Sequence, residues 1–204
     1  MWVYKIVKRW YKGILTRVRR SAFQAGSVYG ENVCFDESAS CTNQTGHKEN
    51  IQIGNNCMIR CQIIALGNGK ITIGDNTYIG VNSRVGAIQN VTIGNNVIIS
   101  SQVHILDNNN HPTAPEQRLQ MTESADYFGE LWSWTKSAHA PVHIQDNVWI
   151  GERCTILKGV SIGKGSIIGA NAVVTRDIPD YVIAAGNPAK VVKHLSPKEG
   201  ISHE

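Results

Sequence analysis

The sequence predicts an all-β protein, a parallel β-helix with triangular coils. Three observations predict it: aliphatic residues at a six-residue period, small or β-branched residues four positions after most of them, and a Gly-Asn or Gly-Asp turn that recurs every 20 residues. Such a period is typical of solenoids, whose repeats bury their apolar faces only by stacking on their neighbours.

The six-residue period defines two sets of inward positions. Successive residues of a strand face opposite sides, so an aliphatic residue and a small residue four later both point inward. The aliphatic set is Ile53, Ile59, Ile73, Ile79, Val85, Ile93, Ile99, Ile105, Ile144, Ile150, Ile156, Ile162, Ile168 and Val174. The small set is Cys57, Ile63, Thr77, Ser83, Val97, Val103, Val148, Cys154, Val160, Ser166 and Ala172, whose two cysteines we expect to be core packing residues rather than ligands.

The recurring turn sets the size of a coil. A Gly-Asn-Asn or Gly-Asp-Asn turn follows Ile53, Ile73 and Ile93, and these residue types tolerate the positive φ that a sharp corner requires. Three sides of six residues make 18, so these 20-residue coils have one longer corner, whereas the coils from Ile144 and Ile162 keep 18. With a weaker first coil over residues 29–45, we expect five or six coils.

Composition is that of one ordinary domain. A chain of 204 residues with 42% hydrophobic residues can bury a sizeable core. Much of its net charge of +4 comes from the first 20 residues, so a nucleic-acid groove is not indicated. Five cysteines without a CxxC pair, and no cleavable signal sequence, predict a reduced and cytoplasmic protein.

The two ends differ from the repeat. Residues 1–22 combine apolar side chains at helical spacing with many Lys and Arg, which predicts a basic amphipathic helix too often interrupted by charge to span a bilayer. It would either lie peripherally on an anionic membrane or pack on a neighbouring subunit. Residues 195–204 have too few apolar side chains to be held down and are expected to form a frayed tail.

The phrases IGNN, ITIGDN, VWIGE and IIGANAVVT resemble the hexapeptide-repeat acyltransferases, over residues 29–194. The resemblance implies a left-handed β-helix and a homotrimer. The handedness comes from the resemblance alone, because right-handed crossovers are the general rule and the six-residue period does not indicate the opposite hand. Within the family, the chain is similar to galactoside and maltose O-acetyltransferases. Its basic opening is similar to those of acetyltransferases in capsule, exopolysaccharide and lipopolysaccharide synthesis.

The regular phase breaks once, between Ile105 and Ile144, which predicts an excursion loop over residues 107–141. Long loops in compact domains are usually functional. The segment LDNNNHPTAPEQR resembles the His-Pro segment of the O-acetyltransferases, which implies that His111 is the catalytic base. An imidazole suits this role because it titrates near neutral pH and can take a proton from a sugar hydroxyl.

Further site residues are expected around this base. Asp107 or Glu116 would orient the imidazole, and His104, which faces outward beside Ile105, would line the same cleft. The resemblance adds Asn82 as a contact to the acceptor hydroxyl. It also implies an acetyl-coenzyme A groove along the last coils. Its residues are Trp149, Ala170, Thr175, Arg176 and Lys193, where the family often has Lys in place of Arg176 and Arg in place of Lys193.

The expected function is acetyl-coenzyme A dependent O-acetyl transfer to a sugar hydroxyl, in surface polysaccharide biosynthesis. The alternatives are N-acetyl transfer to an amino sugar, acetylation of an antibiotic, a non-catalytic structural trimer and a carbonic anhydrase-like metal trimer. No metal is expected, because His104, His139 and His143 do not reproduce the three-histidine zinc set that the last alternative requires.

Overall fold

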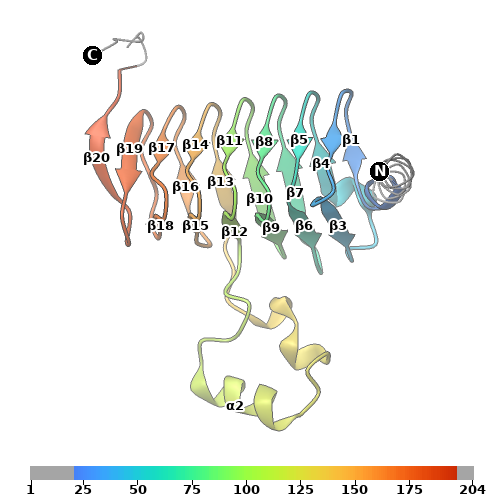
Figure 1. The fold of residues 1–204 in the computed structure, drawn as a ribbon. Helices are drawn as coiled ribbons and strands as arrows, with labels where there is room; N and C mark the ends of the chain where they lie inside the picture. The colour runs from blue at the N-terminus through green and yellow to red at the C-terminus, as the bar shows by residue number, and fades with distance from the viewer. Residues whose placement is uncertain (1–20, 197–204) are drawn as a thin grey trace, which may run out of the picture.

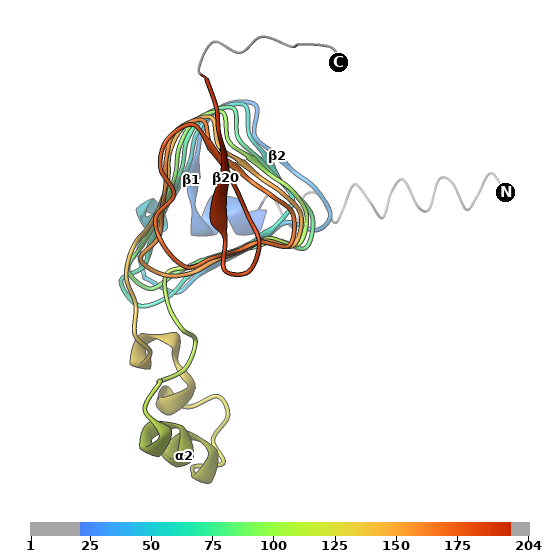
Figure 2. The ribbon, with the colours of Figure 1, turned by 90° about the vertical axis from the view of Figure 1, so that its left-hand side faces the viewer.

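The computed structural model describes residues 21–196, which form a triangular prism of stacked coils with one loop standing out from its side (Figures 1 and 2). Each side of the prism is a parallel sheet whose strands come from successive coils. Two of the sheets have six strands, so the prism has six coils, the upper of the two expected numbers.

Sheet A consists of β1 (Val28–Tyr29), β4 (Ile51–Ile53), β7 (Lys70–Ile73), β10 (Asn90–Ile93), β13 (Val142–Ile144) and β16 (Ser161–Ile162). Sheet B consists of β2 (Cys34–Phe35), β5 (Met58–Ile59), β8 (Tyr78–Ile79), β11 (Ile98–Ile99), β14 (Trp149–Ile150), β17 (Ile167–Ile168), β19 (Val182–Ala185) and β20 (Lys190–His194). Sheet C consists of β3 (Ser40–Asn43), β6 (Gln62–Ala65), β9 (Arg84–Ala87), β12 (His104–Leu106), β15 (Thr155–Ile156) and β18 (Val173–Val174).

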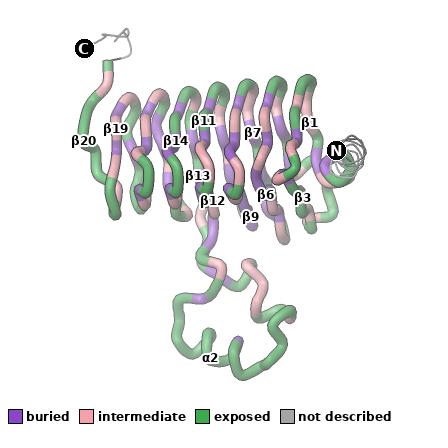
Figure 3. Tube along the Cα trace, viewed as in Figure 1, coloured by how far each residue is buried: buried purple, intermediate pink, exposed green. Residues whose placement is uncertain are grey.

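The strand register confirms the predicted coil lengths. Ile53 pairs with Ile73, and Ile73 with Ile93, which are the steps of the longer coils. Ile93 then pairs with Ile144 across the excursion, and Ile144 pairs with Ile162, the step of the shorter coils. All the predicted aliphatic positions are buried in one column that runs along the prism axis, and buried residues concentrate in the prism (Figure 3).

One predicted inward position is assigned differently by the structure. Ile63 pairs with Val85, which in turn pairs with Ile105, so Ile63 occupies one of the aliphatic positions rather than one of the small-residue positions. Cys61, fully buried, takes the small position in that coil. The corner after Ile59 is shorter than the matching corner of the next coil, and the longer corner of this coil follows in the turn at Gly67.

Small residues with a polar atom link each coil to the next. The hydroxyl of Thr77 donates to the Gly94 carbonyl (3.1 Å) and accepts from the Val97 N–H (3.3 Å). Ser83 and Ser166 make the same kind of bridge to the coil that follows each of them. These buried hydroxyls therefore satisfy backbone groups at the corners, where the sheets leave them without a strand partner.

The turns form a second link along the corner between sheets A and B. The Asn55 N–H donates to the carboxylate of Asp75 (2.6 Å), the Asp75 N–H to the Asn95 side chain (2.8 Å), and the Asn95 N–H to Asp146 (2.7 Å). The positive φ that the sequence predicts falls on the last Asn of each turn, 55° to 57° at Asn56, Asn76 and Asn96.

The prism ends differently at its two termini. Residues 21–26 are helical, and Phe23 stacks on Phe35 with ring centroids 3.9 Å apart, which covers the first coil. At the other end β20 runs antiparallel to β19, an exception to the predicted parallel order, because the chain reverses at the turn of residues 186–188. The proposed helix over residues 1–22 and the tail over 195–204 lie largely outside the described residues.

Among residues 21–196, no helix is long and apolar enough to cross a membrane.

Candidate active site

The excursion between β12 and β13 spans residues 107–141 and contains α2 (Pro115–Glu123) and two short 3-10 helices, η2 (Glu130–Trp132) and η3 (Trp134–Lys136). A third 3-10 helix, η1 (Lys48–Asn50), lies elsewhere, before β4. The two ends of the excursion pair with each other: the Asn109 N–H donates to the Ala138 carbonyl, and the Ala140 N–H to the Asp107 carbonyl. The loop therefore leaves the prism on a two-stranded stem.

Trp134 holds the loop against sheet C. A Cβ added at Gly86 would lie 2.8 Å from the Trp134 ring and 2.7 Å from Leu106, so only glycine leaves room for this ring on the strand. The inward and outward periodicity of β9 gives no sign of this requirement, because the ring belongs to η3 in the excursion, far from β9 in the sequence.

Asp107 anchors the start of the stem. Its fully buried carboxylate accepts the backbone N–H groups of Ile88 (3.0 Å), Gln89 (2.7 Å) and Asn90 (2.8 Å), which form the corner between β9 and β10. It also accepts the side-chain amide of Asn108 (3.1 Å). The expectation that Asp107 orients the imidazole of His111 is thus not met in this structure, because its oxygens bind the preceding coil instead.

His111 lies at the end of a chain of hydrogen bonds that begins at Asp107. The Asn108 side-chain oxygen accepts the Asn110 N–H (2.9 Å), and the His111 N–H donates to the Asn109 carbonyl (2.7 Å). Asn110 has a φ of 63°, a left-handed conformation that asparagine tolerates better than most residues. The exposed His111 ring makes a T-shaped contact with the Trp132 ring, with centroids 5.5 Å apart and planes at 84°.

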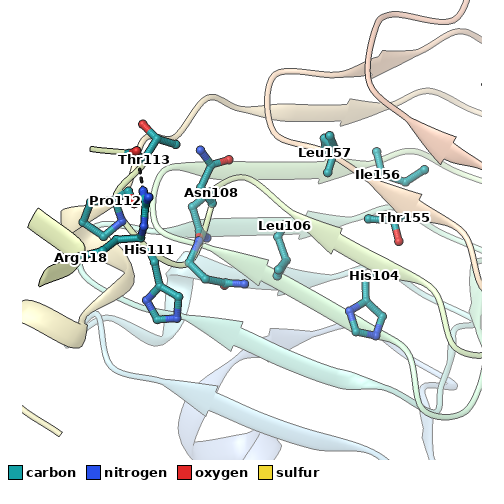
Figure 4. Close-up of a pocket in the computed structure, with 12 residues that line it drawn as sticks. His104, Leu106, Asn108, His111, Pro112, Thr113, Arg118, Thr155, Ile156 and Leu157 are labelled. Atoms are coloured by element: carbon teal, nitrogen blue, oxygen red, sulfur yellow. Dashed lines mark hydrogen bonds between the residues drawn. The ribbon is translucent and has the colours of Figure 1, made fainter. Parts of the chain in front are cut away.

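The imidazoles of His111 and His104 border one open groove of about 570 Å³ (Figure 4). In the close-up the two rings point the same way, His111 from the loop and His104 from β12, with Leu106 between them. Residues of the next coil close the other side. The full lining is His104, Leu106, Asn108, Asn109, Asn110, His111, Pro112, Thr113, Arg118, Thr155, Ile156 and Leu157.

Glu116, expected to orient His111, and Asn82, expected to contact the acceptor hydroxyl, lie outside this groove. Glu116 is an exposed residue in the first turn of α2, and the described structure gives it no hydrogen bond to the imidazole. Asn82 forms the exposed corner between β8 and β9 with a φ of 58°. The groove also contains residues that the sequence did not predict, among them Arg118, which donates to the Pro112 carbonyl and shapes the His-Pro turn, and Leu157 on the facing coil.

The residues expected to hold coenzyme A lie on two faces of one prism. Trp149 and Lys193 belong to sheet B, where Trp149 is in register with Tyr78 and Ile98, as its outward position predicts. Ala170 lies before β18, and Thr175 and Arg176 lie after it, on the corners of sheet C. All five are exposed. Arg176 and Lys193 offer cationic groups to phosphates, and sheet C leads from Thr175 and Arg176 to the groove.

The cysteines behave as packing residues. Cys57, Cys61 and Cys154 are buried, and burial raises the pKa of each thiol. Burial likewise raises the pKa of Cys41 to about 11, so none of the four is a thiolate near neutral pH. Residues 21–196 contain no group of three or more His, Cys, Asp or Glu side chains able to hold a metal ion.

Two family models match this chain, the bacterial transferase hexapeptide with six repeats over residues 141–176 and the hexapeptide repeat of succinyl-transferase over residues 70–101. The galactoside O-acetyltransferase of Escherichia coli is 35% identical over 150 residues, 74% of this chain and 57% of that protein. A Saccharomyces cerevisiae protein provisionally named as an acetyltransferase is 43% identical over 150 residues, which are 74% of this chain and 59% of that protein. The matched region thus spans under two thirds of these relatives.

Solved structures show the same fold. AntD, an N-acyltransferase from Bacillus cereus solved with dTDP-4-amino-4,6-dideoxyglucose and coenzyme A, aligns with a TM-score of 0.66 at 22% identity over 86% of this chain and 87% of that chain. The polySia specific acetyltransferase NeuO aligns with a TM-score of 0.58 at 26% identity over 85% of this chain and 75% of that chain. The class is therefore the left-handed parallel β-helix, as predicted. The coils over residues 70–101 and 141–176 match hexapeptide repeats of bacterial transferases.

Proposed function

We propose that this protein is an acetyl-coenzyme A dependent O-acetyltransferase that acts on a sugar hydroxyl in surface polysaccharide biosynthesis, with His111 as general base. The observation that carries the proposal is that His111 lies in an open groove. The hydrogen-bonded stem of the loop, which is anchored to the prism, holds it there. The similarity to the E. coli galactoside O-acetyltransferase and the fold shared with NeuO support a sugar acceptor.

In the proposed reaction acetyl-coenzyme A supplies the acetyl group as a thioester. His111 removes the proton from the acceptor hydroxyl as its oxygen bonds to the thioester carbonyl carbon, and the proton then goes to the coenzyme thiolate when the carbon–sulfur bond breaks. His104, which faces the same groove, would contact the substrate. Thr175, Arg176 and Ala170 would hold the coenzyme along the corners of sheet C.

A homotrimer would complete this site. In one chain Trp149 and Lys193 lie on sheet B, a different face from the groove, and in a trimer these residues of a neighbouring copy would face a coenzyme in the groove. The outer face of sheet B is apolar enough for such an interface: Ile98 is 52% exposed and Trp149 48%. The row in register with them also contains Met58, Tyr78, Ile167 and Ile183.

The test measures release of free coenzyme A from acetyl-coenzyme A over a panel of sugars, amino sugars and nucleotide sugars. His111→Ala should lower kcat about a hundredfold or more, because general-base catalysis contributes that much. His143→Ala is the matched control, since His143 is exposed on sheet A and should keep wild-type kcat. Full activity of His111→Ala would remove His111 as the base. Turnover with amino sugars alone would assign N-acetyl transfer instead.

A further inference from the structure

We infer that a second groove, on the side of the loop that faces the earlier coils, binds neutral sugar units of an extended glycan acceptor next to the unit that is acetylated. This inference deepens the proposed function and rests on it. The groove has a volume of about 480 Å³ and joins the excursion loop to the earlier coils. Its lining is Gln44, Leu66, Tyr127, Phe128, Gly129, Glu130, Trp132, Ser133 and Trp134.

The position follows from the edge of sheet C where its strands end. Along this edge Gln44 follows β3, Leu66 follows β6, Asp107 follows β12 and Leu157 follows β15. The stem of the loop leaves at Asp107, so Gln44 and Leu66 lie on one side of it and Leu157 on the other. Neighbouring strands are ~4.8 Å apart, so Leu66 and Leu157, three strands apart, are separated by about 14 Å along the prism.

Trp132 lies between the second groove, which it lines, and His111, which lines the first. The Trp132 indole makes a T-shaped contact with the His111 ring. The indole N–H donates to the Met121 carbonyl (3.0 Å), which fixes the ring between them. A chain of sugars with one hydroxyl at His111 can therefore continue past Trp132 toward Leu66, while the opposite side toward Leu157 and Thr175 stays open for the coenzyme.

The lining has the chemistry that a sugar requires. Four of its nine residues are aromatic, and rings of this kind offer flat apolar surface to the C–H face of a pyranose. Phe128 is completely exposed, and Tyr127 is 62% exposed although its ring packs on Trp132 with centroids 5.2 Å apart, so both present ring surface to a ligand. Gln44 and Ser133 add hydrogen-bonding groups for hydroxyls, as in ligand sites that combine apolar walls with few polar groups.

Among the described residues, the lining offers no cationic side chain to an acidic sugar. Glu130 is the charged residue in the lining, and no Lys or Arg of the described chain lines the groove. The side chain of Lys136 pairs with Glu130 at 2.5 Å but lies outside the lining. Since Lys136 is already paired with Glu130, a carboxylate or phosphate on the sugar gains no ion pair from the lining, and acidic glycans should bind no more tightly than neutral ones.

The experiment measures glycan binding and acetyl transfer separately. Calorimetry with maltose-, cellobiose- and chitobiose-type oligosaccharides of one to four units, and with sialic acid oligomers, measures binding to the full chain. The variants are Phe128→Ala and Gln44→Ala, one from the loop and one from the prism, both exposed and therefore not needed for folding. Leu119→Ala is the matched control, a 56% exposed residue on α2 outside the groove.

We expect a neutral tetrasaccharide to bind more tightly than its monosaccharide, and Phe128→Ala to weaken that binding about fivefold, as expected for one lost ring contact. Leu119→Ala should bind as wild type, and His111→Ala should keep glycan binding while losing transfer. Equal binding of one and four units, unchanged binding by Phe128→Ala and Gln44→Ala, tighter binding of sialic acid oligomers, or no binding of any glycan would each overturn the inference. Full transfer activity of His111→Ala would instead contradict the proposed base.

Discussion

At the scale of single residues, Asp107 shows how the site is tied to the prism. A buried carboxylate that accepts three backbone N–H groups and one side-chain amide is fully used in structure and has no free oxygen for catalysis. Its effect on His111 passes through Asn108 and Asn110, whose hydrogen bonds shape the turn that carries the imidazole. We therefore predict that Asp107 acts as a positioning residue.

Asp107→Asn tests this role. The amide has one acceptor oxygen in place of two and places its N–H₂ group against backbone donors, so the free energy of unfolding should fall by about 1–3 kcal/mol. Amide exchange of Ile88, Gln89 and Asn90 should become faster, and kcat should fall while the KM for acetyl-coenzyme A stays. Denaturant unfolding, hydrogen exchange and kinetics measure these three effects.

The control for Asp107→Asn is Asp126→Asn, an exposed residue of the same loop. It should leave stability, exchange and kcat as in the wild type. Unchanged exchange at residues 88–90 in Asp107→Asn would contradict the positioning role.

At the scale of the strands and corners, the hydroxyl bridges decide how firmly one coil holds the next. Thr77→Val keeps the shape of the side chain but removes the bonds to the Gly94 carbonyl and the Val97 N–H. Leaving buried backbone groups unpaired should lower the free energy of unfolding by about 1–2 kcal/mol. Thr72→Val, on the exposed face of sheet A, should change it by less than about 0.5 kcal/mol. Equal effects of the two substitutions in denaturant unfolding would show that the bridge does not stabilise the stack.

The periodic features of the strands and corners could be predicted from the sequence. Buried Ile and small residues recur at fixed spacing because each strand sees the same environment, so the register from Ile53 to Ile162 and the limits of the excursion follow from the pattern. The inward positions of Cys61 and Ile63 did not follow from the pattern, because one corner of that coil is shorter and another is longer, which leaves the total coil length unchanged. Contacts between the loop and the prism, such as Asp107 with Gln89 or Trp134 over Gly86, also leave no periodic signal.

Within the site, the sequence predicted His111 and His104 in one groove, whereas the proposed roles of Asn82, Glu116 and the coenzyme residues stay predictions. The partners of Asp107 could not be predicted, since a carboxylate in an Asn-rich segment fits a catalytic and a structural role equally well. Only the three-dimensional corner at residues 88–90 distinguishes them.

At the scale of the whole molecule, the outer face of sheet B bears on assembly. If this face is the trimer interface, Ile98→Lys should place a charge in it and separate the subunits. Light scattering should then give three times the chain mass of 22.4 kDa for the wild type, and the mass of one chain for the variant. Thr72→Lys on sheet A is the matched control and should stay trimeric. A wild-type particle with the mass of one chain would contradict the trimer.

The excursion leaves the stacking of the coils before and after it unchanged, since Ile93 of β10 is in register with Ile144 of β13 just as it is with Ile73 on its other side. Closing the longer segment costs only about 0.8 kcal/mol more than closing an ordinary coil, because the entropy of loop closure grows with the logarithm of length. The scaffold can thus exchange this segment for another of different length or sequence at little thermodynamic penalty. If the excursion selects the acceptor and the coils hold the coenzyme, as we propose, new acceptor preferences can arise by exchange of this one insertion while the coils stay the same.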